Sequence, residues 1–337
     1  MAADNLISPS DLATYSGPPL FLFVGISTAG SSIHRMFPRW APAFNPEARV
    51  LGVDLPPDAP AEVFRRLVGD MGVNPDIRGA VVTSHKVRLF ASCSDLFDFT
   101  SPLVDIAHEV NSISSSGGLH AFATDPIALD AVIGEVRPRA VDPAPIVCLG
   151  SGGSAAALAL THLLDIEQTL SVGRVVPRRA VDGALTIVAR RASALPELEE
   201  LLSRLPESDR IQLTVAVDSR ERTSLTASQP AGSLVINATG LGKTEAGSPV
   251  DGAHAFPAGA VAWDFNYRGP LTFLEQAREA GVRTEDGWDY FLAGWSTALA
   301  AIEGRPTEAV LAAVREASSG VRSVGTGAGK REGTDPY

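Results

Sequence analysis

Three glycines stand together where the chain passes from one apolar stretch to another. Gly150, Gly152 and Gly153, with Ser151 among them, lie in the run PIVCLGSGGS, and AAALALTHLL follows. A tight turn from a strand into a helix requires glycine on steric grounds alone. A bound phosphate requires it too, because residues without Cβ let the phosphate reach unpaired N–H groups at the helix N-terminus. The pattern is G-x-G-G rather than the full G-x-G-x-x-G, so both interpretations stay open at this point.

Two adjacent arginines end the next apolar run after the glycines. Arg190 and Arg191 follow ALTIVA, about 40 residues beyond the turn. In a dinucleotide-binding fold the second strand ends beside the ribose, where an acid suits a 2′-hydroxyl and an arginine suits a 2′-phosphate. Planar guanidinium groups pair well with phosphate oxygens. If the glycine turn binds a dinucleotide, NADP is therefore favoured over NAD; otherwise the two arginines simply face water.

The composition argues against several classes of partner. The 337 residues carry a formal net charge of −11, with 45% hydrophobic and 20% charged residues, as is usual for a globular protein. Without a basic stripe, an acidic chain is not expected to bind nucleic acid or a membrane surface. Two cysteines, Cys93 and Cys148, give no disulfide framework. We expect a cytoplasmic protein, since neither a signal peptide nor an apolar run of the ~18 residues needed to span a membrane is evident.

Patterns of strand and helix alternate along the chain in two sets. The first set comprises PLFLFVGI, ARVLGVDL, PAEVFRRLVGDMG and RGAVVTSHK, then two short β-like pieces, DIAHEVNSIS and LHAFATDP. The second set comprises PIVCLG, AAALALTHLL, ALTIVAR, LPELEELLSRL, IQLTVAV, SLVINATG, AVAWDFNY and PLTFLEQAREAG. This alternation predicts an α/β protein of two domains, the second doubly wound. SSIHRMFPRWAPAF begins like a helix that its prolines should interrupt.

Seven motifs occur in one order: VVTSHK, EVNSIS, LHAFATDP, LGSGGSAAA, LVINATG, WDFNY and EDGWDYFLAGWSTALAAIEG. This order resembles the shikimate dehydrogenase family, which includes quinate and aminoshikimate dehydrogenases, over about residues 19–317. The resemblance implies an α/β substrate domain, completed by C-terminal helices, and a Rossmann domain that binds NADP. The implied domains are 19–130 with 288–317, and 131–287. Residues 318–337 are rich in glycine, serine and charge, and we expect a disordered tail. The resemblance also implies a monomer or homodimer and a place in aromatic amino acid biosynthesis.

The same resemblance assigns roles to individual residues. The catalytic lysine and aspartate of the family match Lys86 in TSHK and Asp125 in ATDP. Its substrate-binding residues match Asn111, Thr83 and Tyr267, and Thr28 stands where the family has a serine. The cofactor side would take Gly150, Ser151, Gly152 and Gly153, Arg190 and Arg191, and Asn237, Thr239 and Gly240 of NATG.

The chemistry of such a site needs these residue types. To oxidise a secondary alcohol, a hydride must leave carbon while a proton leaves oxygen. A lysine beside an aspartate can relay that proton if burial or neighbouring charges tune its pKa. The six histidines form no H-E-x-x-H or comparable cluster, so no metal is expected.

The positions that would recognise the substrate depart from the family pattern. Thr28 and Gly30 stand in place of two serines that hold the substrate carboxylate. Gly294 stands in place of a glutamine, and the bulky Trp295 beside it is expected to fill the freed space. Because buried polar contacts make a site reject near-isosteres, these changes favour a different substrate.

The sequence therefore favours an NADP-dependent dehydrogenase that acts on a small cyclic hydroxy acid through an altered pocket. One alternative is a true shikimate or quinate dehydrogenase in which Ser27, Thr28 or Ser31 compensates for the missing serines. The other is a ligand-sensing relative without catalysis, although a sensor has no need of both Lys86 and Asp125.

Overall fold

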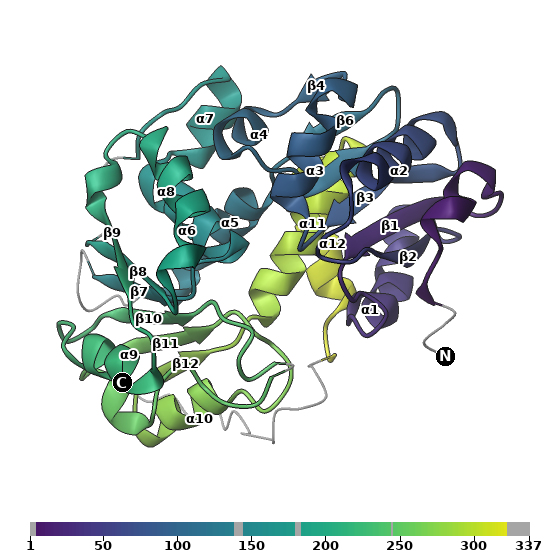
Figure 1. Cartoon of the computed structure of the whole chain (residues 1–337). Coiled ribbons are helices and arrows are strands. Elements are labelled where there is room, and N and C mark those ends of the chain that lie inside the picture. The colour runs from purple at the N-terminus through teal and green to yellow at the C-terminus, as the bar shows by residue number, and fades with distance from the viewer. Residues whose placement is uncertain (1–4, 138–143, 179–182, 244, 322–337) are drawn as a thin grey trace.

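The computed structural model describes residues 5–137, 144–178, 183–243 and 245–321, which form two sheets side by side (Figure 1). The strand order is β2-β1-β3-β5-β6-β4 in the first sheet and β12-β11-β10-β7-β8-β9 in the second. The strands of the first sheet are β1 (Leu20–Gly25), β2 (Arg49–Asp54), β3 (Ile77–Val82), β4 (Phe99–Thr100), β5 (Ser112–Ser114) and β6 (His120–Phe122). Those of the second are β7 (Ile146–Leu149), β8 (Leu185–Ala189), β9 (Ile211–Val215), β10 (Leu234–Asn237), β11 (Val261–Asp264) and β12 (Arg283–Glu285).

The first sheet is mixed. Strand β1 lies between β2 and β3 and pairs with both in parallel, whereas β5 runs antiparallel to β3 and to β6. Nearly every residue of β1 is buried, which explains why LFLFVG is continuously apolar rather than alternating: helices cover both faces of a parallel strand.

The second sheet is parallel throughout. Chain order along it reverses between β7 and β10, which pair directly. A doubly wound sheet binds its ligand in the crevice beyond the carboxyl ends of the strands at such a reversal. The glycine turn follows β7, so it lies at this point. The predicted fold class, α/β with a Rossmann-type second unit, is confirmed.

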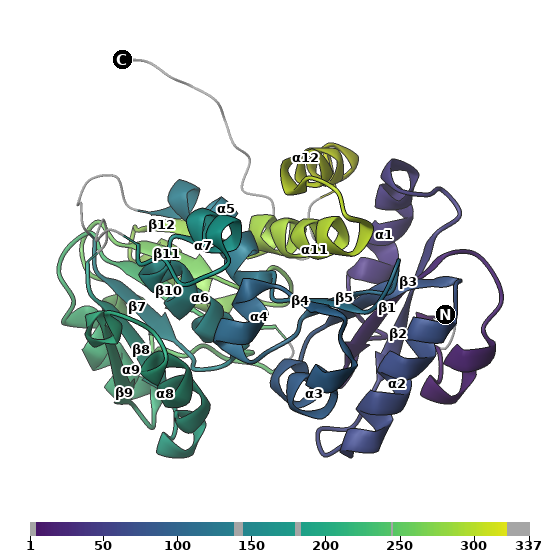
Figure 2. The ribbon, with the colours of Figure 1, turned by 90° about the horizontal axis from the view of Figure 1, so that it is seen from above.

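Twelve α-helices are found among the described residues and surround the two sheets (Figure 2). Their bounds are α1 (Ile33–Trp40), α2 (Ala61–Val73), α3 (Lys86–Cys93), α4 (Pro102–Ala107), α5 (Asp125–Val136), α6 (Gly153–Leu163), α7 (Ile166–Val172), α8 (Pro196–Ser203), α9 (Ser219–Ala227), α10 (Thr272–Glu279), α11 (Trp288–Glu303) and α12 (Thr307–Ala317). Helix α5 connects the two halves, because it packs against both α6 and α11. No helix of the described part is long and apolar enough to cross a membrane.

Two features of the structure bear on the expected division into domains, one at the domain boundary and one at the expected tail. Helix α11 packs against β3 and β5 of the first sheet, and residue 131, the expected boundary, lies inside α5 rather than in a loop. At the expected tail, Ser318 is buried and its Oγ accepts a hydrogen bond of 2.9 Å from Trp40 Nε1; residues 322–337 lie outside the described part. The division into domains stays a prediction.

The prolines after Ile33 do not interrupt the helix where expected. Helix α1 continues through Pro38 to Trp40, and only then gives way to a 3-10 turn over Ala41–Ala43. A proline inside a helix removes one backbone hydrogen bond and costs ~3 kcal/mol. The buried face of α1, formed by Ile33, Phe37 and Trp40 among others, outweighs that loss.

Candidate active site

The glycine turn meets a steric demand at Gly150 and leaves the start of helix α6 open. At φ +121°, Gly150 lies so close to the loop after β10 that a Cβ would stand 2.7 Å from Ala238 O, so no other residue fits. Gly152 instead faces open space within 4 Å of its missing Cβ. Helix α6 begins at Gly153 without a side-chain cap, so its first N–H groups are available to an anion.

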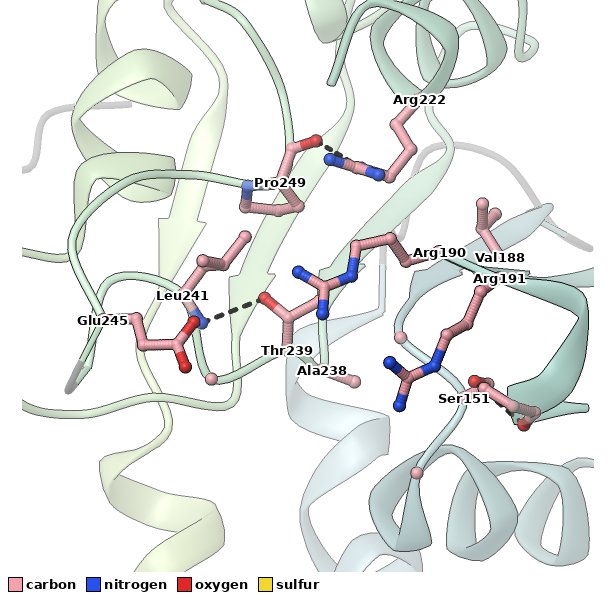
Figure 3. A pocket seen from close by; sticks show the side chains of 14 residues that line it. Ser151, Val188, Arg190, Arg191, Arg222, Ala238, Thr239, Leu241, Glu245 and Pro249 are labelled. Atoms are coloured by element: carbon pink, nitrogen blue, oxygen red, sulfur yellow. Dashed lines mark hydrogen bonds between the residues drawn. The ribbon is translucent and has the colours of Figure 1, made fainter. Parts of the chain in front are cut away.

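A cavity of about 320 Å³ opens at the carboxyl ends of β7, β8 and β10 (Figure 3). We call it the first cavity; its lining includes Gly150, Ser151, Gly152, Arg190, Arg191, Thr239 and Gly240. Figure 3 shows the guanidinium groups of Arg190 and Arg191 projecting into it. Neither forms an ion pair with another residue of the described chain. Seven of the nine residues expected on the cofactor side thus line one cavity, and two unpaired cations face it.

The remaining two expected cofactor-side residues are Gly153 and Asn237. Gly153 lines a neighbouring cavity, described below. Asn237 is fully buried and supports the loop above it: its Oδ1 accepts hydrogen bonds from Thr239 N (3.0 Å) and Thr239 Oγ1 (2.6 Å). Asn237 therefore shapes the wall of the first cavity without facing it.

Lys86 and Asp125 stand at the first residues of α3 and α5 and form an ion pair. Asn111 Nδ2 donates to the other carboxylate oxygen of Asp125 at 2.5 Å. Asn111 is fixed in turn, because its Oδ1 accepts a 2.7 Å hydrogen bond from Thr124 N. Three residues from separate elements thus form one connected polar group.

The charges of this group set its protonation. Burial lowers the pKa of Lys86, but the carboxylates of Asp125 and Glu109 outweigh burial, so the pKa is raised above its usual value. Lys86 is therefore an ammonium group at neutral pH, poised to donate a proton and to stabilise negative charge on a neighbouring oxygen.

A second cavity, of about 350 Å³, separates α3 from α8. Its lining includes Thr83, Lys86 and Glu109 on one side and Ser151, Gly152 and Gly153 on the other. Ser151 and Gly152 line both cavities, and the missing Cβ of Gly153 would lie 3.4 Å from Lys86 Nζ. The two arginines and the lysine therefore lie at opposite ends of one hollowed surface.

Comparison with known proteins now bears on this arrangement. No family model matches the chain. A curated relative, the shikimate dehydrogenase (NADP(+)) of Caulobacter vibrioides, is 31% identical over 225 residues, which cover 64% of this chain and 67% of the relative. The chain belongs to the shikimate dehydrogenase family.

Solved structures share the fold of this family member. Shikimate 5-dehydrogenase from Thermus thermophilus, in complex with NADP(H) and shikimate, superposes with a TM-score of 0.61 at 20% identity, covering 88% of this chain and 99% of that one. The 5-ketofructose reductase of Gluconobacter superposes with a TM-score of 0.61 at 19% identity, covering 90% of this chain and 99% of that one. At such identities the likeness supports the fold alone.

In this member of the shikimate dehydrogenase family, the residues expected to bind substrate do not all lie in one cavity. Thr83 is exposed and lines the second cavity. Tyr267 is 6% exposed and packs against the rings of Trp288 and Phe291, and its hydroxyl interacts with Ser32. Tyr267 follows β11 of the second sheet, while Ser32 directly precedes α1 beside the first sheet, so the two halves meet here.

Thr28 is buried and its hydroxyl is already hydrogen-bonded. Its side chain is 1% exposed, and its hydroxyl donates to Asp54 Oδ1 at 2.6 Å while its backbone N–H donates to the same oxygen at 2.7 Å. Because that hydroxyl already has an acceptor and is shielded from solvent, Thr28 holds the loop after β1 in place and offers no donor to a substrate. This geometry gives no support to Thr28 as a substrate-binding residue, and that role stays a prediction.

Trp295 does not fill the space beside Gly294. Its ring packs into the core against Phe23, with centroids 5.1 Å apart, and no atom stands within 4 Å of the missing Cβ of Gly294. The position is open rather than blocked, as is Gly30.

Sequence reasoning missed three charged groups. Arg222 lines the first cavity, but its guanidinium donates to the carbonyls of Pro249, Ala216 and Val217. Glu109 lies in the second cavity, and Lys243 Nζ lies 5.9 Å from the centre of the Tyr267 ring. No local pattern marks these residues, because each is brought to its site by distant segments. Among the described residues, no cluster of His, Cys, Asp and Glu could hold a metal ion.

Proposed function

We propose that the chain is an NADP-dependent dehydrogenase that interconverts a secondary alcohol and a ketone on a small cyclic hydroxy acid, with a substrate pocket that differs from that of shikimate dehydrogenase. The observation that carries this proposal is the meeting of the two cavities at Ser151 and Gly152. The first cavity offers the unpaired guanidinium groups that a dinucleotide phosphate requires. The second cavity offers Lys86, whose ion pair with Asp125 suits proton transfer to or from an alcohol.

NADP fits the residues of the first cavity. Arg190 and Arg191 would pair with a 2′-phosphate, and the uncapped N-terminus of α6 would receive the pyrophosphate beside Gly152. The wall built by Thr239 and Gly240 would lie against the dinucleotide. When bound, the cofactor supplies or accepts the hydride.

The chain's own residues handle the proton. In ketone reduction, the Lys86 ammonium donates a proton to the oxygen that becomes the hydroxyl, and in alcohol oxidation the proton returns to Lys86. Asp125 orients the ammonium through their ion pair, and Asn111 fixes Asp125. A positioned proton donor of this kind typically contributes ~10²–10⁴-fold to the rate.

Positive charge near Tyr267 favours an acidic substrate. Burial raises the pKa of Tyr267 while Arg268 and Arg35 oppose this rise, and Lys243 lies over the Tyr267 ring. Burial and the Arg268 charge both lower the pKa of Lys243, as expected where cations gather. These cations would attract the substrate carboxylate in place of the missing serines, with different geometry and so different selectivity.

The test is turnover of a panel. The protein is incubated with NADP⁺ or NAD⁺ and with shikimate, quinate and other cyclic hydroxy acids, and absorbance of the reduced cofactor is followed. We expect NADP⁺ to be preferred and shikimate to be oxidised slowly compared with another member of the panel. Efficient shikimate or quinate oxidation would favour an ordinary dehydrogenase of that substrate, and binding of NADPH without any turnover would favour a sensor.

A further inference from the structure

Glu109 is a buried carboxyl group that the chemistry proposed above does not use. It lies in the segment between α4 and β5, and its side chain is only 4% exposed. It lines the second cavity together with Lys86. Its Oε1 has no hydrogen-bond partner among the described residues. Since burying a polar group without a partner is costly, this carboxyl calls for a functional explanation.

The groups that face Glu109 come from three elements. Lys86 comes from α3, Asp125 from α5 and Tyr290 from α11, and each is electrostatically coupled to it. The wall of the cavity adds Arg88 and Glu197, both exposed. Arg88 is fixed away from Glu109, because its guanidinium donates to the carbonyls of Pro57 and Ala59.

These surroundings make Glu109 a group that can gain or lose a proton near neutrality. Burial raises the pKa of Glu109 to about 7, the positive charge of Lys86 opposes this rise, and Asp125 adds to it. Lys86 differs, because its own pKa is raised above the usual value. An ammonium so stabilised loses its proton to water slowly, whereas an acid whose pKa matches the surrounding pH exchanges readily in both directions.

We propose that Glu109 passes the reaction's proton between Lys86 and water in the second cavity. The inference rests on the function proposed above. In ketone reduction, the N–H bond of Lys86 breaks as the new hydroxyl O–H bond forms. The carboxyl O–H of Glu109 then breaks, directly or through one water molecule, as the N–H bond of Lys86 re-forms. The Glu109 carboxylate finally takes a proton from solvent. Oxidation follows the same path in reverse, and only a proton moves along it.

The experiment replaces the carboxyl in two ways. Glu109→Gln keeps the shape and removes the acid, whereas Glu109→Ala leaves space for a small buffer molecule. Glu199→Gln, an exposed residue of α8 outside the cavity, is the matched control. Steady-state kcat and KM are measured with NADP⁺ and whichever of shikimate, quinate and the other acids of the panel the unmodified protein oxidises fastest, across about pH 5–9, with and without added imidazole.

The expected result is a loss that a small buffer repairs. Both Glu109 variants should lose about 10²-fold in kcat, the lower end for a proton-transfer group, with KM nearly unchanged. Imidazole should restore most of kcat in Glu109→Ala and little in Glu109→Gln. The inflection of kcat near pH 7 in the unmodified protein should disappear from both variants, and Glu199→Gln should behave like the unmodified protein.

Other outcomes separate the two proposals. An unchanged pH profile in the variants, or a loss of kcat that imidazole does not repair, would overturn the proton path and leave the dehydrogenase function standing. No turnover of any acid of the panel by the unmodified protein would overturn the proposed function and this inference with it. If the variants fold but are too slow to assay, the pH dependence of the midpoint of thermal unfolding, compared between Glu109→Gln and the unmodified protein, still decides whether Glu109 is an acid of raised pKa, because that dependence needs no turnover.

Discussion

The carboxyl edges of the two sheets carry binding groups in different ways. At the second sheet, the turns that directly follow β7, β8 and β10 supply Gly150, Arg190 and Thr239, all of which line the first cavity. At the first sheet, Thr28 in the loop after β1 is buried, and its hydroxyl donates its hydrogen bond to Asp54. Beside this loop, the hydroxyl of Tyr267 interacts with Ser32, and Tyr267 belongs to the other half of the chain.

The difference shows which parts of such a protein can change. A dinucleotide site relies on backbone N–H groups and on residues close in sequence, so it persists wherever the turn persists. A substrate site relies on side chains from distant segments, and each can be replaced without disturbing the fold. We infer that this chain kept the proton-transfer pair and the cofactor side while its substrate side changed.

The largest effect on turnover is expected at the proton-transfer pair, Lys86 and Asp125, because the reaction needs it whichever substrate is bound. Lys86→Ala and Asp125→Asn should each reduce kcat by about 10²–10⁴-fold, while NADPH binding stays near normal because neither residue lines the first cavity. Asp58→Asn, at an exposed position, is the control for the change of charge. Native turnover in either active-site variant would move the proton transfer to other residues.

Glu109 gives the next effect, on stability. Its pKa is raised from 4.5 to about 7 in the folded protein, so the folded state binds this proton more tightly than the unfolded state does. The free energy of unfolding should therefore fall as pH rises from about 4.5 to 7, by about 3 kcal/mol at 1.36 kcal/mol per unit. Glu109→Gln should lack this fall. The midpoint of thermal unfolding of the variant, minus that of the unmodified protein, should therefore increase as pH rises. Parallel curves would contradict the raised pKa.

The cofactor side is tested by removing its cations. A charge-assisted hydrogen bond contributes about 1.5–3 kcal/mol, or roughly ten- to over a hundredfold in affinity. Replacing Arg190 and Arg191 together by alanine should therefore weaken NADPH binding by at least that factor and leave NADH binding almost unchanged. Arg220→Ala, an exposed residue of α9 that does not line the cavity, should have little effect. Equal affinity of the unmodified protein for both cofactors would refute the assignment.

Substitutions on the substrate side should have the smallest effect, and they should raise activity toward shikimate rather than lower it. No atom stands within 4 Å of a Cβ added at Gly30 or Gly294, so Gly30→Ser combined with Gly294→Gln can be accommodated. Each restored hydrogen bond to the substrate contributes about 0.5–1.5 kcal/mol, so kcat/KM for shikimate should rise by roughly tenfold. Gly69→Gln, at an equally open position of α2, is the control. A double variant no better than the control would show that these positions do not reach the substrate.

Sequence alone could predict much of the second half of the molecule and less of the first. The glycines after β7 and the arginines after β8 follow directly from strand ends, so their convergence is implied by the order of a parallel sheet. The role of Thr28 could not be foreseen, because its partner Asp54 lies 26 residues away. Nor could the setting of Glu109 be foreseen, because its electrostatic neighbours Lys86, Asp125 and Tyr290 come from three separate helices. The short helices α3 and α4 also escaped prediction, since six to eight residues give too little periodicity.

The central claim is that a shikimate dehydrogenase relative kept its proton-transfer pair while its substrate recognition changed. Its most direct test is kcat/KM for shikimate oxidation by the unmodified protein with NADP⁺, measured beside other cyclic hydroxy acids. We predict that shikimate falls well below the usual enzyme range of about 10⁴–10⁸ M⁻¹s⁻¹, because the Thr28 hydroxyl and the Gly294 position offer it no donor, while another acid of the panel reaches that range. A value for shikimate inside that range would contradict the account.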